Sequence, residues 1–391
     1  MNKRIRVGII TIHKSTANYG ACLQCYALWK YISSLGYDCE VVDLLRPSAH
    51  ENYISSKNDK VDFLFHIKER VRKIIAISKG YNKIFKNRFE QYKKFNSNVK
   101  YSREYRSVDE LYSSPPIYDI YISGSDQIWN PNMLFDIAPY LLSFAPKGSI
   151  KLAYASSFAI GRLPENVKQE YAKYLRDYSF ISVREDSGKS IVSELLNKDA
   201  TVVLDPVFLI EPQAWIDMSD NFLVPNKKYI LIYSLDINQK LVSVAKDIAK
   251  NKDYSIIMIL AAYKYYTIDS ITQNANAGPL QWLGLIKNAE LLLTDSFHGT
   301  VFSMQFGINF LCYIDSKSKV NDRIISLARK FNIENNFVYE NQINSVDELL
   351  RKSFIDYSNL FVKIKDEVDK SKKYIIDALN RFNGVNRLSS E

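Results

Sequence analysis

The segment most informative about the fold is Leu291-Leu292-Leu293-Thr294-Asp295-Ser296-Phe297-His298-Gly299-Thr300. An apolar run gives way there to a short polar turn, and a helical pattern follows at residues 301–306. This order predicts a buried parallel strand that leads into the N-terminus of a helix. Ligands of open α/β sheets bind at the carboxyl ends of strands, and the free N–H groups of a helix start attract anions. His298 therefore stands where a proton carrier and an anion site are expected together.

Apolar runs alternate with helical patterns along most of the 391 residues. The runs form two sets: 7–11, 40–44, 117–122, 152–156, 180–183 and 201–204, then 229–234, 255–261, 291–294 and 310–314. Strand–helix alternation predicts an α/β protein with parallel, doubly wound, Rossmann-like sheets. A chain of this length exceeds one ordinary core, so we expect two domains. The stretch 206–225 separates the sets, since it has three prolines and no long apolar run.

These patterns place the first domain at residues 1–210 and the second at 211–358. A last helix is expected over 359–391, where it would dock back on the first domain. Residues 60–106 are basic and interleaved with aromatic residues at near-helical spacing, which predicts a helical insertion. A solvated helical face is the plain interpretation of such a charge run. A surface for anionic lipid or for a diphosphate-lipid substrate is the alternative.

The bulk composition narrows the class of partner. The chain has 52 basic and 43 acidic residues, a net charge of +9, which favours an anionic partner. No nucleic-acid-binding motif accompanies the basic stretch, so nucleic acid is not expected. No apolar run approaches the about 20 residues that span a bilayer, and the apolar start is too short for a secretory signal. We expect a cytoplasmic protein, with contact at the inner face of the membrane as an alternative.

The four cysteines do not form a recognisable metal or redox site. Cys22 and Cys25 make a Cys-x-x-Cys pair, but they lie in a helical pattern with no second pair to complete a zinc site. A redox pair needs an exposed first cysteine at a helix start. We therefore expect core cysteines, no metal and no cofactor.

Polar loops follow two strands of the first set. The loop after residues 7–11 contains Asn18 and Gly20, which suit a tight turn, and Gln24 lies one turn into the next helix. It is not a Gly-x-Gly-x-x-Gly loop, so a nicotinamide cofactor is not supported, and a plain connection explains it equally well. Residues 123–131 follow the run at 117–122, and their density of hydrogen-bonding groups is typical of a sugar or anion site. Within them Asp126 could equally be a helix N-cap.

Arg184 follows the strand at 180–183. Its planar guanidinium is the group best shaped to grip a phosphate or carboxylate with two hydrogen bonds. A salt bridge to a neighbouring acid is the alternative. Asp205 precedes Pro206, and we expect it to be structural because Asp-Pro commonly caps a turn.

In this order along the chain, five segments resemble the polysaccharide pyruvyl transferase family: Asn18-Tyr19-Gly20-Ala21-Cys22-Leu23-Gln24, Ser123-Gly124-Ser125-Asp126-Gln127-Ile128-Trp129-Asn130-Pro131, Ser182-Val183-Arg184-Glu185, Leu204-Asp205-Pro206 and Asp295-Ser296-Phe297-His298-Gly299. The resemblance spans about residues 5–335. It implies a two-domain fold similar to glycosyltransferase type B, with the active site in the cleft between the domains. It also implies transfer of pyruvate from phosphoenolpyruvate to a saccharide as a ketal, in bacterial surface polysaccharide biosynthesis.

The resemblance assigns roles to residues of this sequence. The family's arginine falls on Arg184 and its histidine on His298. Ser296 stands where better-studied members often have arginine, so the second donor-binding cation would be Lys14 or Arg323. We expect His298 to act as the acid and Asp126 as the base on the acceptor hydroxyl. The donor would also meet Ser296, Gly299 and Thr300, and the acceptor side would be lined by Asn18, Gly20, Gln24, Ser125, Gln127 and Asn130.

Two other functions fit the same sequence. The same type of fold supports a glycosyltransferase that uses a nucleotide sugar. A non-catalytic saccharide-binding protein is permitted by Ser296, although His298 and Arg184 argue against it. The expected partners are phosphoenolpyruvate and a saccharide acceptor, for which linkage to a diphosphate lipid stays open.

Overall fold

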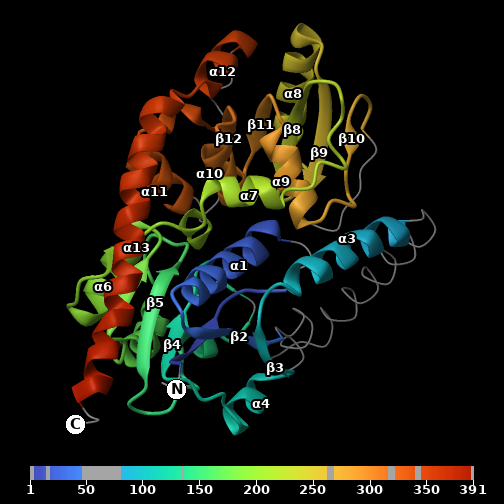
Figure 1. The fold of residues 1–391 in the computed structure, drawn as a ribbon. Coiled ribbons are helices and arrows are strands. Elements are labelled where there is room, and N and C mark those ends of the chain that lie inside the picture. Colours follow the sequence, from blue (N-terminus) through green and yellow to red (C-terminus); the bar gives the residue numbers. More distant parts are fainter. Residues whose placement is uncertain are drawn as a thin grey trace, which may run out of the picture.

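The computed structural model describes residues 4–14, 18–45, 81–133, 135–261, 268–315, 322–339 and 345–388. Over these ranges the chain forms two parallel sheets, one above the other in Figure 1, with helices packed around both. The central strands are apolar on both faces: every residue of β4, β8, β11 and β12 is buried. Helices on both faces of a sheet remove the alternation of buried and exposed residues, which explains the continuous apolar runs in the sequence.

The first sheet has the order β3-β2-β1-β4-β5-β6-β7. In that order the strands are Tyr101–Tyr105, Asp38–Leu44, Arg6–Ile10, Ile120–Ser123, Ile150–Ser156, Phe180–Val183 and Thr201–Val202. The strand order reverses between β1 and β4. This is the topological switch point, where sheets of this kind bind ligands at their carboxyl edge.

The second sheet has the order β10-β9-β8-β11-β12-β13. In that order the strands are Thr272–Gln273, Ser255–Leu260, Tyr229–Ser234, Leu291–Thr294, Phe310–Ile314 and Phe337–Tyr339. Its switch point lies between β8 and β11. Residues 291–300 therefore consist of β11, a short turn and the start of the next helix, α10 (Phe297–Phe306).

The helices follow the strands in the expected alternation. The α-helices are α1 (Tyr19–Ser34), α3 (Tyr81–Asn96), α4 (Val108–Ser113), α5 (Glu165–Leu175), α6 (Asp186–Leu196), α7 (Pro212–Met218), α8 (Gln239–Lys252), α9 (Pro279–Lys287), α10 (Phe297–Phe306), α11 (Asp322–Phe331), α12 (Val346–Ser353) and α13 (Tyr357–Leu388). Short 3-10 helices are η1 (Ala138–Leu141), η2 (Pro206–Leu209) and η3 (Glu334–Asn336). The change from the first sheet to the second falls between β7 and β8, and a domain boundary near residue 210 remains our proposal.

The sequence patterns found ten strands and missed three, namely β3, β10 and β13. All three lie at sheet edges, where a strand needs no continuous apolar run. The expected helical insertion at 60–106 is wrong for residues 101–105, because they form β3. Of the rest, α3 covers Tyr81–Asn96, and residues 60–80 lie outside the described ranges.

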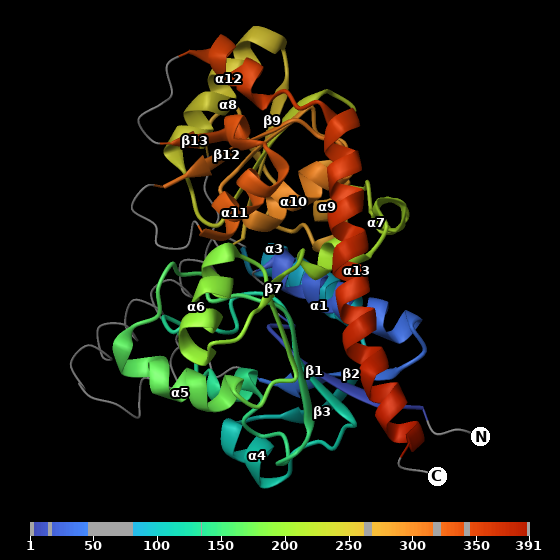
Figure 2. The ribbon, with the colours of Figure 1, turned by 90° about the vertical axis from the view of Figure 1, so that its left-hand side faces the viewer.

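The last helix, α13, runs along both sheets (Figure 2). At its start the Tyr357 hydroxyl donates to the carbonyl of Ile308, next to the second sheet, at 2.5 Å. Further along, Ser371 Oγ accepts a hydrogen bond of 3.0 Å from the Leu204 amide, and the ring of Phe382 lies 6.0 Å from that of Phe180 in β6. The helix therefore ties the two sheets together on one side of the molecule.

A second connection, the aromatic clasp, joins the sheets and consists of Tyr19, Arg88, Tyr92, Tyr233 and Trp282. Tyr19 of α1 stacks on Trp282 of α9 with ring centroids 5.3 Å apart and planes at 6°. The guanidinium of Arg88 in α3 donates to the carbonyl of Leu260 at the end of β9 and to that of Ala261 directly after it, at 3.0 and 2.9 Å. Figure 1 shows α3 between the two sheets. Arg88 is fully buried, so it belongs to this interface and not to an exposed cationic face.

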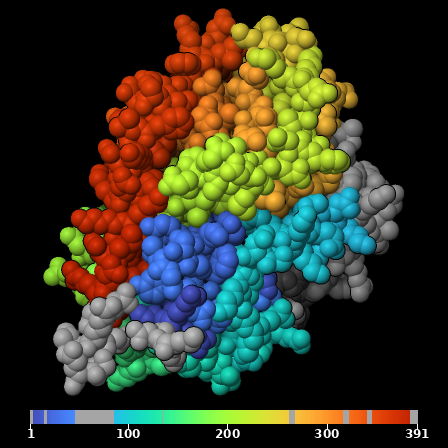
Figure 3. Space-filling model, viewed as in Figure 1, coloured from blue at the N-terminus to red at the C-terminus, as the bar shows by residue number. Residues whose placement is uncertain are grey.

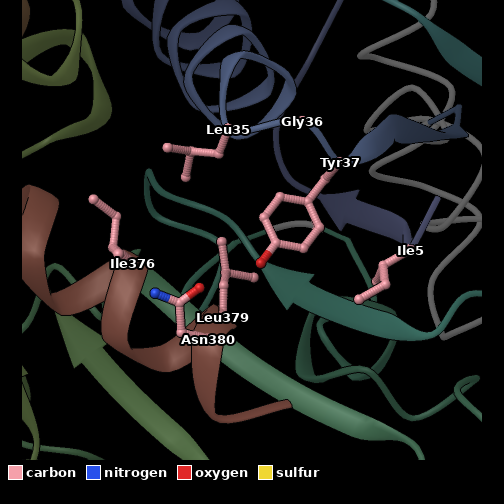
Figure 4. Close-up of a pocket in the computed structure, with 7 residues that line it drawn as sticks. All are labelled: Ile5, Leu35, Gly36, Tyr37, Ile376, Leu379 and Asn380. Carbon is pink, nitrogen blue, oxygen red and sulfur yellow. The ribbon is translucent and has the colours of Figure 1, made fainter. Parts of the chain in front are cut away.

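The two halves also meet without a gap on the face seen in Figure 3, where atoms of α7 lie directly on those of α1. The ring of Trp215 in α7 is 5.7 Å from that of Tyr26 in α1. A shallow depression lies elsewhere, lined by Ile5, Leu35, Gly36, Tyr37, Ile376, Leu379 and Asn380 (Figure 4). Ile5 and Tyr37 directly precede β1 and β2, so this depression is at the amino edge of the first sheet, opposite its ligand-binding edge.

Candidate active site

The two switch points face each other. His298 follows β11, and it packs against Gly20 at the start of α1, the helix that follows β1. A side-chain carbon built on Gly20 would lie 1.9 Å from Nδ1 of His298, so only glycine allows this approach. The carboxyl edges of both sheets and the N-termini of α1 and α10 therefore converge on one place.

Five ionisable side chains from both halves gather at this place and form the charged cluster: Asp126, Arg184, Asp205, His298 and Arg323. Each has less than a tenth of its surface exposed. Buried charges persist only where they are paired, because removal from water costs each ion several kcal/mol. The contacts within the cluster therefore decide its chemistry.

Asp205 lies at the centre of the cluster. Its Oδ2 accepts from Arg184 Nη1 at 2.5 Å and from Ser125 Oγ at 3.2 Å. His298 Nε2 is 3.6 Å from the same oxygen, just beyond hydrogen-bond distance. Oδ1 caps η2 by accepting from the Val207 amide at 3.1 Å. The turn-capping role expected from the sequence is thus only half of what Asp205 does, and its contacts to Arg184 and His298 were missed because they join segments far apart in the chain.

Asp126 follows β4 in a strained backbone conformation, with a φ of 70° in the left-handed region. Its Oδ1 accepts from the Gln127 amide at 2.9 Å. Arg184 Nη2 and Arg323 Nη1 approach the same oxygen at 3.5 and 3.7 Å. Asp126 is therefore the shared counter-ion of two arginines and not a helix N-cap.

The two arginines also share an aromatic neighbour. Their guanidinium carbons lie 4.5 Å (Arg184) and 5.7 Å (Arg323) from the ring centre of Phe297. Nε of each arginine is buried without a hydrogen-bond partner. Arg184 comes from the loop after β6, and Arg323 comes from α11 beside the second sheet.

The pKa shifts reflect competition between burial and charge. Burial alone would raise the pKa of Asp126, but its neighbours Arg184, His298 and Arg323 outweigh that effect and lower the pKa. The pKa of Asp205 is likewise lowered although burial opposes it, through His298 and Arg184. Burial and repulsion by Arg184 lower the pKa of Arg323 to about 10. An additional anion would relieve that repulsion.

Glu185 is a further buried carboxyl beside the cluster. Its Oε1 accepts from Ser157 Oγ and from the amides of Phe158 and Ala159, at 2.8, 2.9 and 3.1 Å. Burial raises its pKa, and the charge of Arg184 only partly offsets that effect. These bonds fix the loop after β5 on the loop that carries Arg184.

The remaining residues expected on the donor side shape the start of α10. Ser296 is its N-cap, and its Oγ accepts from the Gly299 amide at 3.4 Å. Gly299 packs closely on Thr294, where a side-chain carbon would lie 2.6 Å from Oγ1. The Thr300 hydroxyl donates to the Ser296 carbonyl at 3.1 Å. These three residues hold His298 in place.

Lys14 contacts residues outside the charged cluster. Its ammonium pairs with Asp43 of β2, and Asp43 also bonds to His13 Nε2 at 2.9 Å. The ammonium lies 4.4 Å from the ring centre of Tyr101 in β3. Of the two cations expected to replace an arginine at Ser296, only Arg323 contacts the cluster.

The residues expected on the acceptor side divide into two groups. Gly20 and Ser125 contact the cluster, as described above. The other four support local structure. Asn18 caps α1, the buried Gln24 amide donates to Thr11 and to two carbonyls, and Asn130 donates to Gln127 at 2.9 Å.

Within the described ranges, no three His, Cys, Asp or Glu side chains come together as a metal site. None of the helices in those ranges is long and apolar enough to cross a membrane.

The chain has the two-domain α/β architecture of glycosyltransferase type B. The UDP-N-acetylglucosamine 2-epimerase of Neisseria meningitidis bound to UDP-GlcNAc has the same fold, with a TM-score of 0.53 and 9% identity, covering 96% of this chain and 100% of that one. MnaA of S. aureus in complex with UDP has a TM-score of 0.52 and 12% identity, covering 97% of each chain. For the 2-epimerase of Rickettsia bellii the values are 0.51 and 11%, covering 98% and 99%. At such low identity these similarities concern the fold alone.

The family to which the chain belongs is shown by its sequence. The model of the polysaccharide pyruvyl transferase family matches residues 18–318, which include the whole charged cluster except Arg323. The chain therefore belongs to the polysaccharide pyruvyl transferases. A search of curated proteins found no significant match.

Proposed function

We propose that this enzyme transfers pyruvate from phosphoenolpyruvate to a saccharide and forms a ketal. The observation that supports this best is the buried pair Arg184 and Arg323, which share Asp126 and the ring of Phe297. Phosphoenolpyruvate carries a phosphate and a carboxylate on three carbons. Two guanidinium groups this close together match two neighbouring oxyanions.

The N-termini of α1 and α10 add to the same anion site. The first amides of a helix have no intrahelical partner, and the helix dipole places partial positive charge there. Gly20 at the start of α1 touches His298 at the start of α10. A phosphate bound between these helix ends and the arginines would be neutralised from both halves of the protein.

Asp126 has two successive roles in this proposal. Without donor it is the counter-ion of Arg184 and Arg323. When the donor's oxyanions bind the arginines, Asp126 loses the charges that lower its pKa. It then becomes a stronger base and can accept the proton of an acceptor hydroxyl.

The reaction proceeds in two additions. The first acceptor hydroxyl adds to C2 as C3 takes a proton, with Asp126 as base and His298 as acid. Phosphate leaves with the electron pair of its C2–O bond, and the second hydroxyl adds to the oxocarbenium-like C2. His298 supplies the proton that C3 gains, Asp126 takes the proton of the first hydroxyl, and the proton of the second hydroxyl passes to the leaving phosphate. Asp126 then gives its proton to solvent and His298 regains one from solvent, so the net products are the ketal and inorganic phosphate. Burial of the cluster limits attack by water on that reactive carbon.

We propose that the acceptor belongs to a bacterial surface polysaccharide, either as a soluble saccharide or linked to a diphosphate lipid. Family membership supports a polysaccharide acceptor. The excess of basic over acidic residues is compatible with a diphosphate-bearing one.

A thermal-shift comparison tests the donor, because only ligands that bind the native state raise the unfolding midpoint. We expect phosphoenolpyruvate to raise it and UDP-sugars to leave it unchanged. Release of inorganic phosphate from phosphoenolpyruvate, dependent on added saccharide, would then test transfer. A midpoint raised by UDP-sugars alone would indicate a glycosyltransferase, and one raised by saccharides alone would indicate a binding protein.

A further inference from the structure

One carboxylate oxygen of Asp205, Oδ2, has three polar side chains close to it. Oδ2 accepts hydrogen bonds from Arg184 and Ser125. His298 Nε2 lies 3.6 Å from Oδ2, and this nitrogen is buried without a hydrogen-bond partner. Oδ1 is fixed by the Val207 amide. A shift of less than about 1 Å would bring Oδ2 and Nε2 to ordinary hydrogen-bond distance.

We propose that Asp205 is a positioning residue that passes its hydrogen bond from Arg184 to His298 when the donor binds, and that the enzyme takes up one proton in this step. The proposal rests on the proposed function, since it needs an anionic donor on Arg184. An oxyanion that binds the guanidinium competes for the N–H that Asp205 accepts. Oδ2 is then free to accept from His298 Nε2, and the ring carries a proton on both nitrogens.

The charges around His298 explain why a proton is required. Asp205, between β7 and η2, lies 3.6 Å from its Nε2, and Asp126 after β4 interacts with it electrostatically. Arg184 after β6 and Arg323 of α11 contact these two aspartates, Glu185 interacts with both arginines, and α1 presents the backbone of Gly20 to the ring. The two aspartates and two arginines sum to zero, so a bound donor leaves the buried cluster strongly negative. One proton on His298 offsets part of that charge, which is costly in a medium of low dielectric.

This step also prepares the chemistry. The proton comes from solvent and enters with the donor, so His298 is an acid only when there is a substrate to protonate. Asp205 does not touch the reacting atoms. It acts through His298 by holding the protonated ring in one orientation.

Calorimetry measures the proton directly. Phosphoenolpyruvate is titrated into the protein at pH 8 in several buffers, and the dependence of the heat on the buffer's ionisation enthalpy gives the number of protons taken up. At that pH the ligand's phosphate is fully ionised, since its second pKa is about 6, and an ordinary histidine is neutral. We expect an uptake of about one proton.

The variants Asp205→Asn and His298→Gln should still bind phosphoenolpyruvate but take up almost no proton. Asp199→Asn, at an exposed position of the same domain, should behave as the unmodified protein. Uptake that survives in Asp205→Asn, or donor binding without uptake by the unmodified protein, would overturn the inference and leave the proposed function intact. If Asp205→Asn does not fold, His298→Gln and the unmodified protein decide the question. Absence of any binding by the unmodified protein would instead refute the proposed function.

Discussion

The aromatic clasp and the charged cluster both join the two halves of this molecule, but they hold by different forces. In the clasp a single charge, on Arg88, meets carbonyl oxygens and aromatic rings. In the cluster two arginines and a histidine compete for the oxygens of two aspartates. The carbonyl partners of Arg88 carry no net charge for an anion to replace, whereas an anion can displace each aspartate from its arginine. The clasp is thus suited to fix the halves, and the cluster to bind and react.

The largest expected effect of breaking the cluster is on turnover. His298→Ala should lower it by about a hundredfold or more, the scale for a general acid–base residue. The unfolding midpoint should barely move, because His298 Nε2 has no hydrogen-bond partner to lose. Steady-state phosphate release and thermal unfolding measure the two effects. A large loss of stability with much residual turnover would mean that His298 is structural.

A substitution in the clasp should lower stability and leave turnover nearly unchanged. Arg88→Met removes two hydrogen bonds to carbonyls and leaves those carbonyls buried, which should cost about 2–4 kcal/mol of unfolding free energy. Turnover per folded molecule should change little. Denaturant unfolding measures the loss, with Lys93→Met on the exposed side of the same helix as the control. If Arg88→Met instead lowers turnover at unchanged stability, the division of roles between the two regions is wrong.

Within the cluster, Arg184→Lys keeps the charge and removes the planar fork of the guanidinium. We expect donor binding to weaken by about tenfold, since an ammonium cannot hold an oxyanion with two parallel hydrogen bonds. Direct titration of phosphoenolpyruvate measures it, with the exposed Arg176→Lys as the matched control. Unchanged affinity would place the donor site elsewhere.

Acid should weaken the cluster before the clasp. The pKa of Asp126 and of Asp205 is lowered in the folded protein, so their contribution to stability is complete above the unfolded value of about 3.9 and is lost as the pH falls through the folded values. Equilibrium unfolding between pH 6 and pH 2 should therefore show a stability loss that starts near pH 4 and is smaller in Asp126→Asn. An equal loss in that variant would show that other carboxyls dominate.

How much of the fold and of the site could be predicted from the sequence depends on how far apart along the chain the contacting residues lie. The strand–helix order was predictable, and so was the position of His298 and Arg184 after the ends of strands. Each of these features lies within a local pattern of apolar run, turn and helix start. The role of Asp205 was not, since its partners Arg184 and His298 are 21 and 93 positions away. The basic stretch 60–106 was expected to present its charges on an exposed face, and this is wrong for Arg88 for the same reason: it is buried, and its carbonyl partners lie 172 and 173 residues further along the chain.

Helix α3 carries the clasp on one face and three exposed lysines, Lys86, Lys93 and Lys94, on the other. These lysine side chains point away from the interface that Arg88 occupies, because side chains on opposite faces of a helix point in opposite directions. We propose that this outer face favours a membrane-borne acceptor, with about 1 kcal/mol for each lysine near an anionic surface at low salt. Reversal of all three to glutamate should reduce binding to anionic vesicles and turnover on a lipid-linked acceptor.

The same triple variant should leave unfolding and turnover on a short soluble acceptor unchanged, which makes this the smallest effect on the enzyme itself. Lys147, Lys250 and Lys252 are exposed outside α3 and provide a control of equal charge change. Sedimentation with vesicles of stated anionic content, at low and at high salt, measures binding. Equal loss in the control triple would reduce the effect to net charge. Absence of vesicle binding by the unmodified protein at low salt would leave the outer face of α3 as a solvated surface, and the clasp as the only function of this helix.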